Sequence, residues 1–136
     1  FENLTTLMSP TLDQKNIQLD TILKEPQLEI MADNNLLEQV LINLLVNAID
    51  AVKENETKLI TFSAFSDKGK VTIKVADNGP GIEPEVMDKI FIPFFSTKKT
   101  GSGIGLSLCK QIMLLHKGSI HVQSVPGKGS AFMISV

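Results

Sequence analysis

The spacing of apolar residues along the chain switches between two periods, and these switches predict where helices and strands lie. From about residue 34 to residue 53, apolar side chains recur every three or four positions, which is typical of an amphipathic helix. Residues 1–16 show the same spacing, although a proline inside the segment would bend that helix. Two further helices are predicted, a short one over residues 83–91 and a longer one over residues 104–117.

Six segments instead alternate apolar and polar residues, as half-buried strands do. Two pairs of them are joined by short glycine-containing turns, SDKG and PGKG, so each pair predicts a β-hairpin. The first two segments are separated by a proline break, and we expect them to pair with one another as well. The six segments are residues 17–23, 28–33, 58–65, 70–77, 119–125 and 130–136.

This order of elements predicts an α+β fold. We expect a two-layer sandwich, in which a mixed, mostly antiparallel sheet of about five to six strands carries about three helices on one face. The 136 residues, 43% of them hydrophobic, suit a single domain that spans residues 1–136. Residues 92–103 (IPFFSTKKTGSG) have turn and glycine chemistry without a core pattern, which predicts a mobile loop.

Composition narrows the class of partner. The net charge of -2 gives no broad basic field, so we expect neither nucleic-acid binding nor contact with a membrane. The single cysteine, Cys109, cannot build a disulfide framework and lies in an apolar helical pattern, which indicates a core position. No apolar stretch approaches the roughly 20 residues that cross a bilayer. We therefore expect a cytoplasmic piece of a longer protein, whose membrane anchoring the sequence leaves open.

Three polar residues interrupt the predicted central helix. Asn43, Asn47 and Asp50 fall within about 60° of one another on the helix surface, with apolar residues on both sides. A buried amide without partners costs about 1–3 kcal/mol, so these groups need partners. A structural hydrogen-bond network would supply them. Alternatively, Asn47 would offer its oxygen to Mg²⁺, with phosphates and waters completing the coordination.

A strand runs directly into a glycine turn at Asp77. In the segment DNGPGI, Gly79 and Gly81 can adopt turns that other residues cannot, so backbone can approach a flat ligand. A carboxylate there would accept a hydrogen bond from the exocyclic amine of adenine and would repel the oxygen of guanine. The same segment is also compatible with an ordinary tight turn.

A second glycine segment opens the last predicted helix. Gly101, Gly103 and Gly105 would present free amide N–H groups that attract phosphate, and Lys98 and Lys99 would add positive charge. The spacing matches neither the dinucleotide fingerprint nor a Walker A loop. A flexible hinge with solvated lysines is the alternative.

In combination, these segments resemble the ATP-binding catalytic domain of bacterial sensor histidine kinases, within the superfamily shared with gyrase, heat-shock chaperone and mismatch-repair ATPases. QVLINLLVNAIDA is similar to the N box, DNGPGI to the first glycine box, FIPFFSTK to the F box and GSGIGLSL to the second glycine box. GKGS is similar to the last glycine element. The resemblance covers nearly the whole chain, with its motifs in the family's order.

The resemblance implies a role for each matching residue. Asn47 would be the Mg²⁺ ligand, Asn43 and Asp50 would face the phosphates, and Asp77 would hold the adenine amine. Residues 92–103 would form an ATP lid, anchored by Phe91, Phe94 and Phe95. The implied catalytic residues are Asn43, Asn47 and Lys98. The implied ATP-binding residues are Asn43, Asn47, Asp50, Asp77, Gly79, Gly81, Ile82, Phe94, Lys98, Lys99, Gly101, Gly103, Ile104, Gly105, Leu106 and Ser130.

The implied reaction is phosphoryl transfer. Hydrolysing members of the superfamily carry a glutamate base where this chain has Asn43, and a neutral amide cannot accept a proton from water. ATP would then persist until a histidine from a separate dimerisation domain of the same protein arrives. His116 and His121 do not match the context of that histidine. A response regulator would act downstream.

Other functions stay open at this point. The first alternative is a nucleotide-sensing regulatory module with little catalysis. A hydrolysing ATPase of the same superfamily is a second, although Asn43 argues against it. A purely structural interaction domain is a third, and it predicts no adenine binding.

Overall fold

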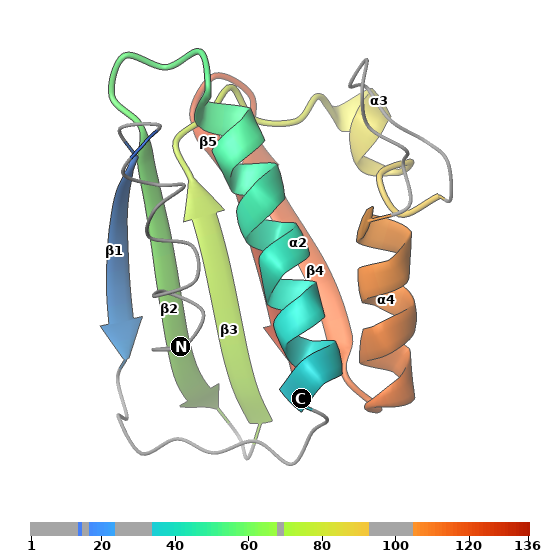
Figure 1. Ribbon diagram of the computed structural model, residues 1–136. Helices are drawn as coiled ribbons and strands as arrows, with labels where there is room; N and C mark the ends of the chain where they lie inside the picture. Colours follow the sequence, from blue (N-terminus) through green and yellow to red (C-terminus); the bar gives the residue numbers. More distant parts are fainter. Residues whose placement is uncertain (1–13, 15–16, 24–33, 68–69, 93–104) are drawn as a thin grey trace.

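A computed structural model describes residues 14, 17–23, 34–67, 70–92 and 105–136, and Figure 1 shows how their helices and strands are arranged. The strands form one sheet in the order β1-β2-β3-β5-β4. β1 runs parallel to β2, and the other neighbours are antiparallel. The strands are β1 (Gln18–Leu23), β2 (Leu59–Asp67), β3 (Lys70–Asp77), β4 (Ser119–Val125) and β5 (Gly129–Ser135).

The helices in the described part of the chain lie on one face of this sheet (Figure 1). They are α2 (Asn34–Val52), α3 (Pro84–Met87) and α4 (Gly105–Leu115). α2 packs against β3 and against α4, and α4 packs against β4. The α+β sandwich with a mixed sheet is therefore confirmed.

Strand alternation determines which side chains enter the core. Phe62 of β2 lies opposite Val75 of β3, which lies opposite Phe132 of β5, and all three are buried. On the helix side, Leu44 and Leu45 are almost completely buried. Each large apolar side chain removed from water in this way contributes about 1.5–3 kcal/mol to stability, so this layer fixes the helices on the sheet.

Several predicted boundaries differ from the structure. The short helix expected over residues 83–91 is confined to α3, and turns follow from Asp88 to Phe91. The first predicted strand pairs with β2, while its expected partner, residues 28–33, lies outside the described residues. The helix expected over residues 1–16 also lies outside them, except for Gln14, which is helical.

The predicted lid overlaps the described residues only at Ile92, so its mobility stays a prediction. Cys109 is fully buried, as its place in the apolar pattern predicted. Within the described ranges, no helix combines the length and the apolar character that crossing a membrane would require.

Candidate functional site

The polar strip of α2 lies beside the first turn of α4. Asn43, Asn47 and Asp50 are each half-buried. A Cβ atom placed on Gly105, the first residue of α4, would lie 3.6 Å from Oδ1 of Asn43. The second glycine segment therefore ends against the strip, and residues distant in sequence become neighbours.

Asn43 has a partner within the protein. Burial raises the pKa of the Cys109 thiol to about 11, and a hydrogen bond with the Asn43 side chain opposes that rise. The Cys109 Sγ atom also lies 3.8 Å from the carbonyl oxygen of Val40. Part of the strip thus takes part in a structural hydrogen-bond network, which was one of the two explanations the sequence left open.

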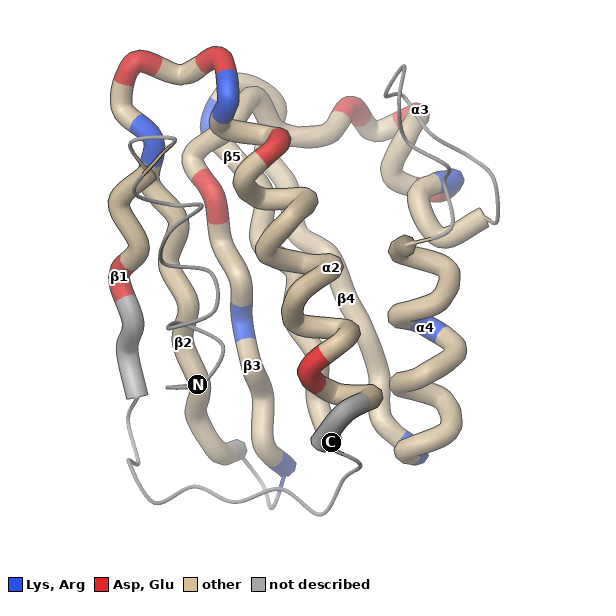
Figure 2. Tube along the Cα trace, in the orientation of Figure 1, with Lys and Arg blue, Asp and Glu red and all other residues tan. Residues whose placement is uncertain are grey.

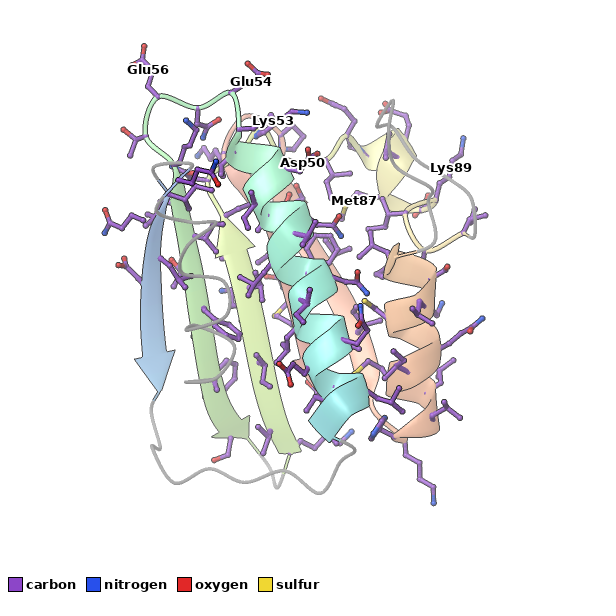
Figure 3. All side chains as sticks on the ribbon, in the orientation of Figure 1. Asp50, Lys53, Glu54, Glu56, Met87 and Lys89 are labelled. Carbon is purple, nitrogen blue, oxygen red and sulfur yellow. The ribbon has the colours of Figure 1, made fainter. Side chains whose placement is uncertain are left out.

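The far end of the strip carries charge. A Lys53 Nζ to Asp50 Oδ1 distance of 3.3 Å defines an ion pair, which is largely exposed on the lysine side. Figure 3 labels Asp50 and Lys53 near the end of α2, and Met87 on α3. An exposed pair of this kind contributes about 0–1 kcal/mol, so Asp50 gains little stability from it.

The first glycine turn follows β3 and meets the end of α2. The N–H of Gly79 donates to Oδ1 of Asp77 at 2.9 Å, which folds the turn back onto the carboxylate. A Cβ atom on Gly79 would lie 2.7 Å from the carbonyl oxygen of Ala51. Gly81 has a φ of 80°, a conformation that favours glycine. Figure 2 shows acidic positions at the ends of α2 and β3, the two ends that meet where Gly79 approaches Ala51.

Asp77 is half-buried at this turn. Burial raises the pKa of its carboxyl group above the ordinary value, while backbone hydrogen bonds from Gly79 and Ser130 lower it in part. The carboxylate is thus partly withdrawn from water and already accepts hydrogen bonds. A carboxylate of this kind binds a further donor strongly, because little water competes for its oxygen atoms.

The tip of the β4–β5 hairpin forms the other side of the turn. The N–H of Gly127 donates to the carbonyl of Pro80 at 2.6 Å. Ser130 is buried, lies directly opposite Asp77 in the ladder, and has its Oγ 2.9 Å from Oγ of Ser124. Sequence reasoning missed Ser124, because a serine beside PGKG is expected in any turn.

Asn78 is a second residue that the sequence analysis missed. Its Nδ2 donates to the carbonyl of Thr57 at 2.9 Å, and its Oδ1 accepts from the N–H of Leu59 at 3.0 Å. Nδ2 of Asn55 donates to the Asn78 carbonyl at 2.6 Å. These bonds tie the loop after α2 to the turn after β3. Asparagine is typical of such turns, but its partners lie too far along the chain to be predicted from local pattern.

Some of the remaining predicted residues pack against the core, and the others lie outside the described residues. Ile82 and Leu106 are half-buried and pack against the core, as does Phe91, over whose ring Lys110 Nζ lies at 5.8 Å. His116 has a structural contact, because its Nδ1 lies 2.8 Å from the Ile112 carbonyl oxygen. Six predicted ATP-binding residues lie outside the described residues and stay predictions: Phe94, Lys98, Lys99, Gly101, Gly103 and Ile104.

Comparison with known proteins identifies the family. Residues 32–136 match the family described as histidine kinase-, DNA gyrase B-, and HSP90-like ATPase, and the chain belongs to this family. The resemblance stated from the sequence motifs is thereby confirmed. Because the family is described by its ATPases, membership supports ATP as the nucleotide.

Two curated proteins that are similar to this chain are histidine kinases. The chain is 41% identical over 129 residues to sensor histidine kinase ZraS of Salmonella typhi, covering 94% of this chain and 27% of ZraS. It is 43% identical over 105 residues to signal transduction histidine-protein kinase AtoS of Escherichia coli, covering 77% of this chain and 17% of AtoS. The chain thus spans about a quarter or less of the length of these relatives.

Solved structures give the same result. The nucleotide-free catalytic domain of histidine kinase ThkA matches with a TM-score of 0.89 and 33% identity, covering 99% of this chain and 88% of that one. The complex of ThkA with the response regulator TrrA matches with a TM-score of 0.85 and 32% identity, covering 99% of this chain and 38% of the ThkA chain.

Proposed function

We propose that this chain binds Mg-ATP and transfers the γ-phosphate to a histidine on a separate dimerisation domain of the same protein, as the catalytic domain of a two-component sensor histidine kinase. The observation that carries this proposal is the meeting of three motifs around α2. Asn43 lies against Gly105 at the start of α4, and Ala51 lies against Gly79 in the turn that holds Asp77. The metal, the phosphates and the base would each contact a different one of these motifs within a single site.

Asp77 is proposed to select the base. The carboxylate has room for a further donor, because it has about four lone-pair positions and the backbone N–H groups of Gly79 and Ser130 use two of them. The exocyclic amine of adenine is such a donor. Guanine presents an oxygen at the same position, and two acceptors facing one another in a half-buried site repel.

Mg²⁺ fits the residues on α2. Asn47 offers an amide oxygen, a hard ligand that Mg²⁺ accepts, and the carboxylate of Asp50 lies one turn further along. Within the described part of the chain, no three His, Cys, Asp or Glu side chains gather into a site that could hold a metal. The protein would therefore supply few ligands, and phosphates and waters the others. When bound, the ion would neutralise charge on the phosphates.

Transfer is favoured over hydrolysis by the two groups that meet where α2 packs on α4, Asn43 and Cys109. Asn43 is a neutral amide, and the Cys109 thiol beside it, with a pKa of about 11, stays protonated at neutral pH. Neither group can take a proton from water. Alignment and charge neutralisation are sufficient for phosphoryl transfer to a stronger nucleophile, which an imidazole provides.

Partners and location follow from this proposal. A response regulator would receive the phosphoryl group from the histidine, as the solved complex of ThkA with TrrA suggests by similarity. Because ATP and response regulators occur in the cytoplasm, we place the domain there. We propose that residues 1–136 act as one ATP-binding unit, with the lid over residues 92–103.

Calorimetry with Mg²⁺ and a non-hydrolysable ATP analogue tests binding directly. We expect Asp77→Asn to weaken binding by about 10-fold or more, because a hydrogen bond to a charged group contributes about 1.5–3 kcal/mol. Lys99→Ala should cost less. Equal losses in the two variants would contradict the assignment of the base pocket.

A second assay tests transfer. The chain is mixed with labelled ATP and a separately produced histidine-bearing hairpin from a ZraS-type kinase, and label on the hairpin is measured. Transfer that is lost in Asn47→Ala supports the kinase. Binding without transfer would favour the nucleotide-sensing module, and steady phosphate release without a hairpin would favour a hydrolysing ATPase.

A further inference from the structure

Three polar side chains form a row across β4, β5 and β3. Ser124 lies opposite Ser130, and Ser130 lies opposite Asp77. Directly opposed residues of antiparallel strands point to the same face of the sheet. That face is the helix-covered one, because Ser130 lies at every-second-residue spacing with the buried Phe132 and Ile134 and so shares their face of β5. The row therefore ends at the carboxylate proposed to hold adenine.

Ser124 makes three hydrogen-bonding contacts. Its Oγ lies 2.7 Å from the backbone nitrogen of Ile82, 3.0 Å from the carbonyl oxygen of Gly129 and 2.9 Å from Oγ of Ser130. The Ile82 N–H can only donate, and the Gly129 carbonyl can only accept. Since a hydroxyl group carries one hydrogen, Ser124 donates it to Gly129.

This assignment fixes the direction of the remaining contact. With its only hydrogen engaged at Gly129, Ser124 can only accept from Ser130, so Ser130 must donate its own hydrogen to Ser124. The Ser130 oxygen then has lone pairs but no hydrogen left. It presents an acceptor beside the acceptor of Asp77.

We propose that Ser124 is a positioning residue for base selection, which holds the hydroxyl of Ser130 as an acceptor and thereby favours a 6-amino purine over a 6-oxo purine. This inference rests on the proposed function and adds to it a residue that does not itself touch the nucleotide. An amino group has two hydrogens, so Asp77 and Ser130 can each accept one, directly or through a water molecule. Without Ser124, the Ser130 hydroxyl can rotate and offer its hydrogen to a 6-oxo group.

Ser124 also supports the turn itself, and the test must separate the two roles. Together with the bond from Gly127 to Pro80, its bond to the N–H of Ile82 holds the glycine turn against the hairpin tip. Loss of that support would weaken the binding of any purine nucleotide. Loss of the oriented acceptor would weaken only the binding of nucleotides that carry the amine.

Affinities of three triphosphates distinguish these effects. ATP carries a 6-amino group, inosine triphosphate a 6-oxo group, and purine riboside triphosphate only hydrogen at that position. For Ser124→Ala we expect about 5- to 10-fold weaker ATP binding, little change for purine riboside triphosphate and a smaller preference for ATP over inosine triphosphate. Ser124→Thr, which keeps the hydroxyl, should restore the preference.

Matched variants complete the design. Gln123→Ala alters an exposed neighbour on the opposite face of β4 and should leave all three affinities unchanged. Ser130→Ala should reproduce Ser124→Ala for ATP, and the double variant should be no weaker than Ser130→Ala alone, because both changes remove the same oriented acceptor.

Equal losses of ATP and purine riboside triphosphate in Ser124→Ala would overturn this inference, since they would show a purely structural role. That result would leave the proposed function intact, because the unaltered chain would still bind ATP. Failure of the unaltered chain to bind any of the three nucleotides would instead overturn the proposed function, and this inference with it.

Discussion

Asp77 combines two properties that oppose one another in the ligand-free protein. Its burial strengthens the hydrogen bonds that its carboxylate can accept, but the same burial raises its pKa, which means that the folded state resists ionising it. The side chain of Asn78, the next residue, makes its hydrogen bonds to the loop after α2 and to the first residue of β2. Of these two neighbours, Asp77 is the residue proposed to bind the nucleotide, whereas Asn78 stabilises the fold.

The raised pKa of Asp77 predicts a dependence of stability on pH. From about pH 4 upward, the unfolded chain ionises Asp77 more readily than the folded chain does, so this residue lowers the free energy of unfolding as pH rises. Asp77→Asn removes that effect and can still accept from Gly79. Chemical denaturation of the ligand-free protein should therefore show Asp77→Asn at least as stable as wild type at pH 7, with any advantage shrinking toward pH 4. A constant loss of stability at both pH values would contradict this.

At the scale of elements, the site depends on close backbone approaches between segments distant in sequence. The end of α2 reaches the turn after β3 at Gly79, and the end of α4 reaches β5 at Gly118, where a Cβ atom would collide with the carbonyl oxygen of Ser135. The sequence predicted a helix over residues 104–117, which ends directly before Gly118. It is Lys117 that takes the left-handed conformation, with a φ of 56°, so Gly118 is required for contact and not for its own φ.

Gly79→Ala should push the turn after β3 away from the end of α2. A Cβ 2.7 Å from the Ala51 carbonyl oxygen forces backbone to move, and overpacking of this kind costs about 1–3 kcal/mol in the free energy of unfolding. We also expect ATP binding to fall, since the turn carries Asp77. Gly127→Ala is the control, because it meets nothing within 4 Å and costs only the strain of a φ of 83°. Normal ATP binding by Gly79→Ala would argue against a site at this junction.

The elements that the sequence predicted best are those whose pattern is local. The helical spacing of α2 and the pairing of strands within the two hairpins depend on residues close in sequence, and the structure confirms α2 and both antiparallel pairs. The parallel pairing of β1 with β2 could not be predicted, because alternation says nothing of direction and α2 lies between the two strands in sequence. The length of α3 was overestimated because helical apolar spacing continues through the turns that follow this helix.

At the scale of the whole molecule, the sheet brings the parts of the site together. β5 of the β4–β5 hairpin pairs with β3 of the β2–β3 hairpin, and this register places Ser130 opposite Asp77. Motif order predicted that Asn47, Asp77 and Gly105 serve one ligand. The hydroxyl of Ser124 was not predictable, because its role depends on the register of two strand pairs.

The most direct measurement is a crystal structure of the chain grown with Mg²⁺ and a non-hydrolysable ATP analogue. We predict that the adenine amine lies within hydrogen-bonding distance of the Asp77 carboxylate, with the Mg²⁺ ion coordinated by the Asn47 side-chain oxygen. A nucleotide bound away from the turn after β3, or a metal that makes no contact with α2, would contradict the proposed site.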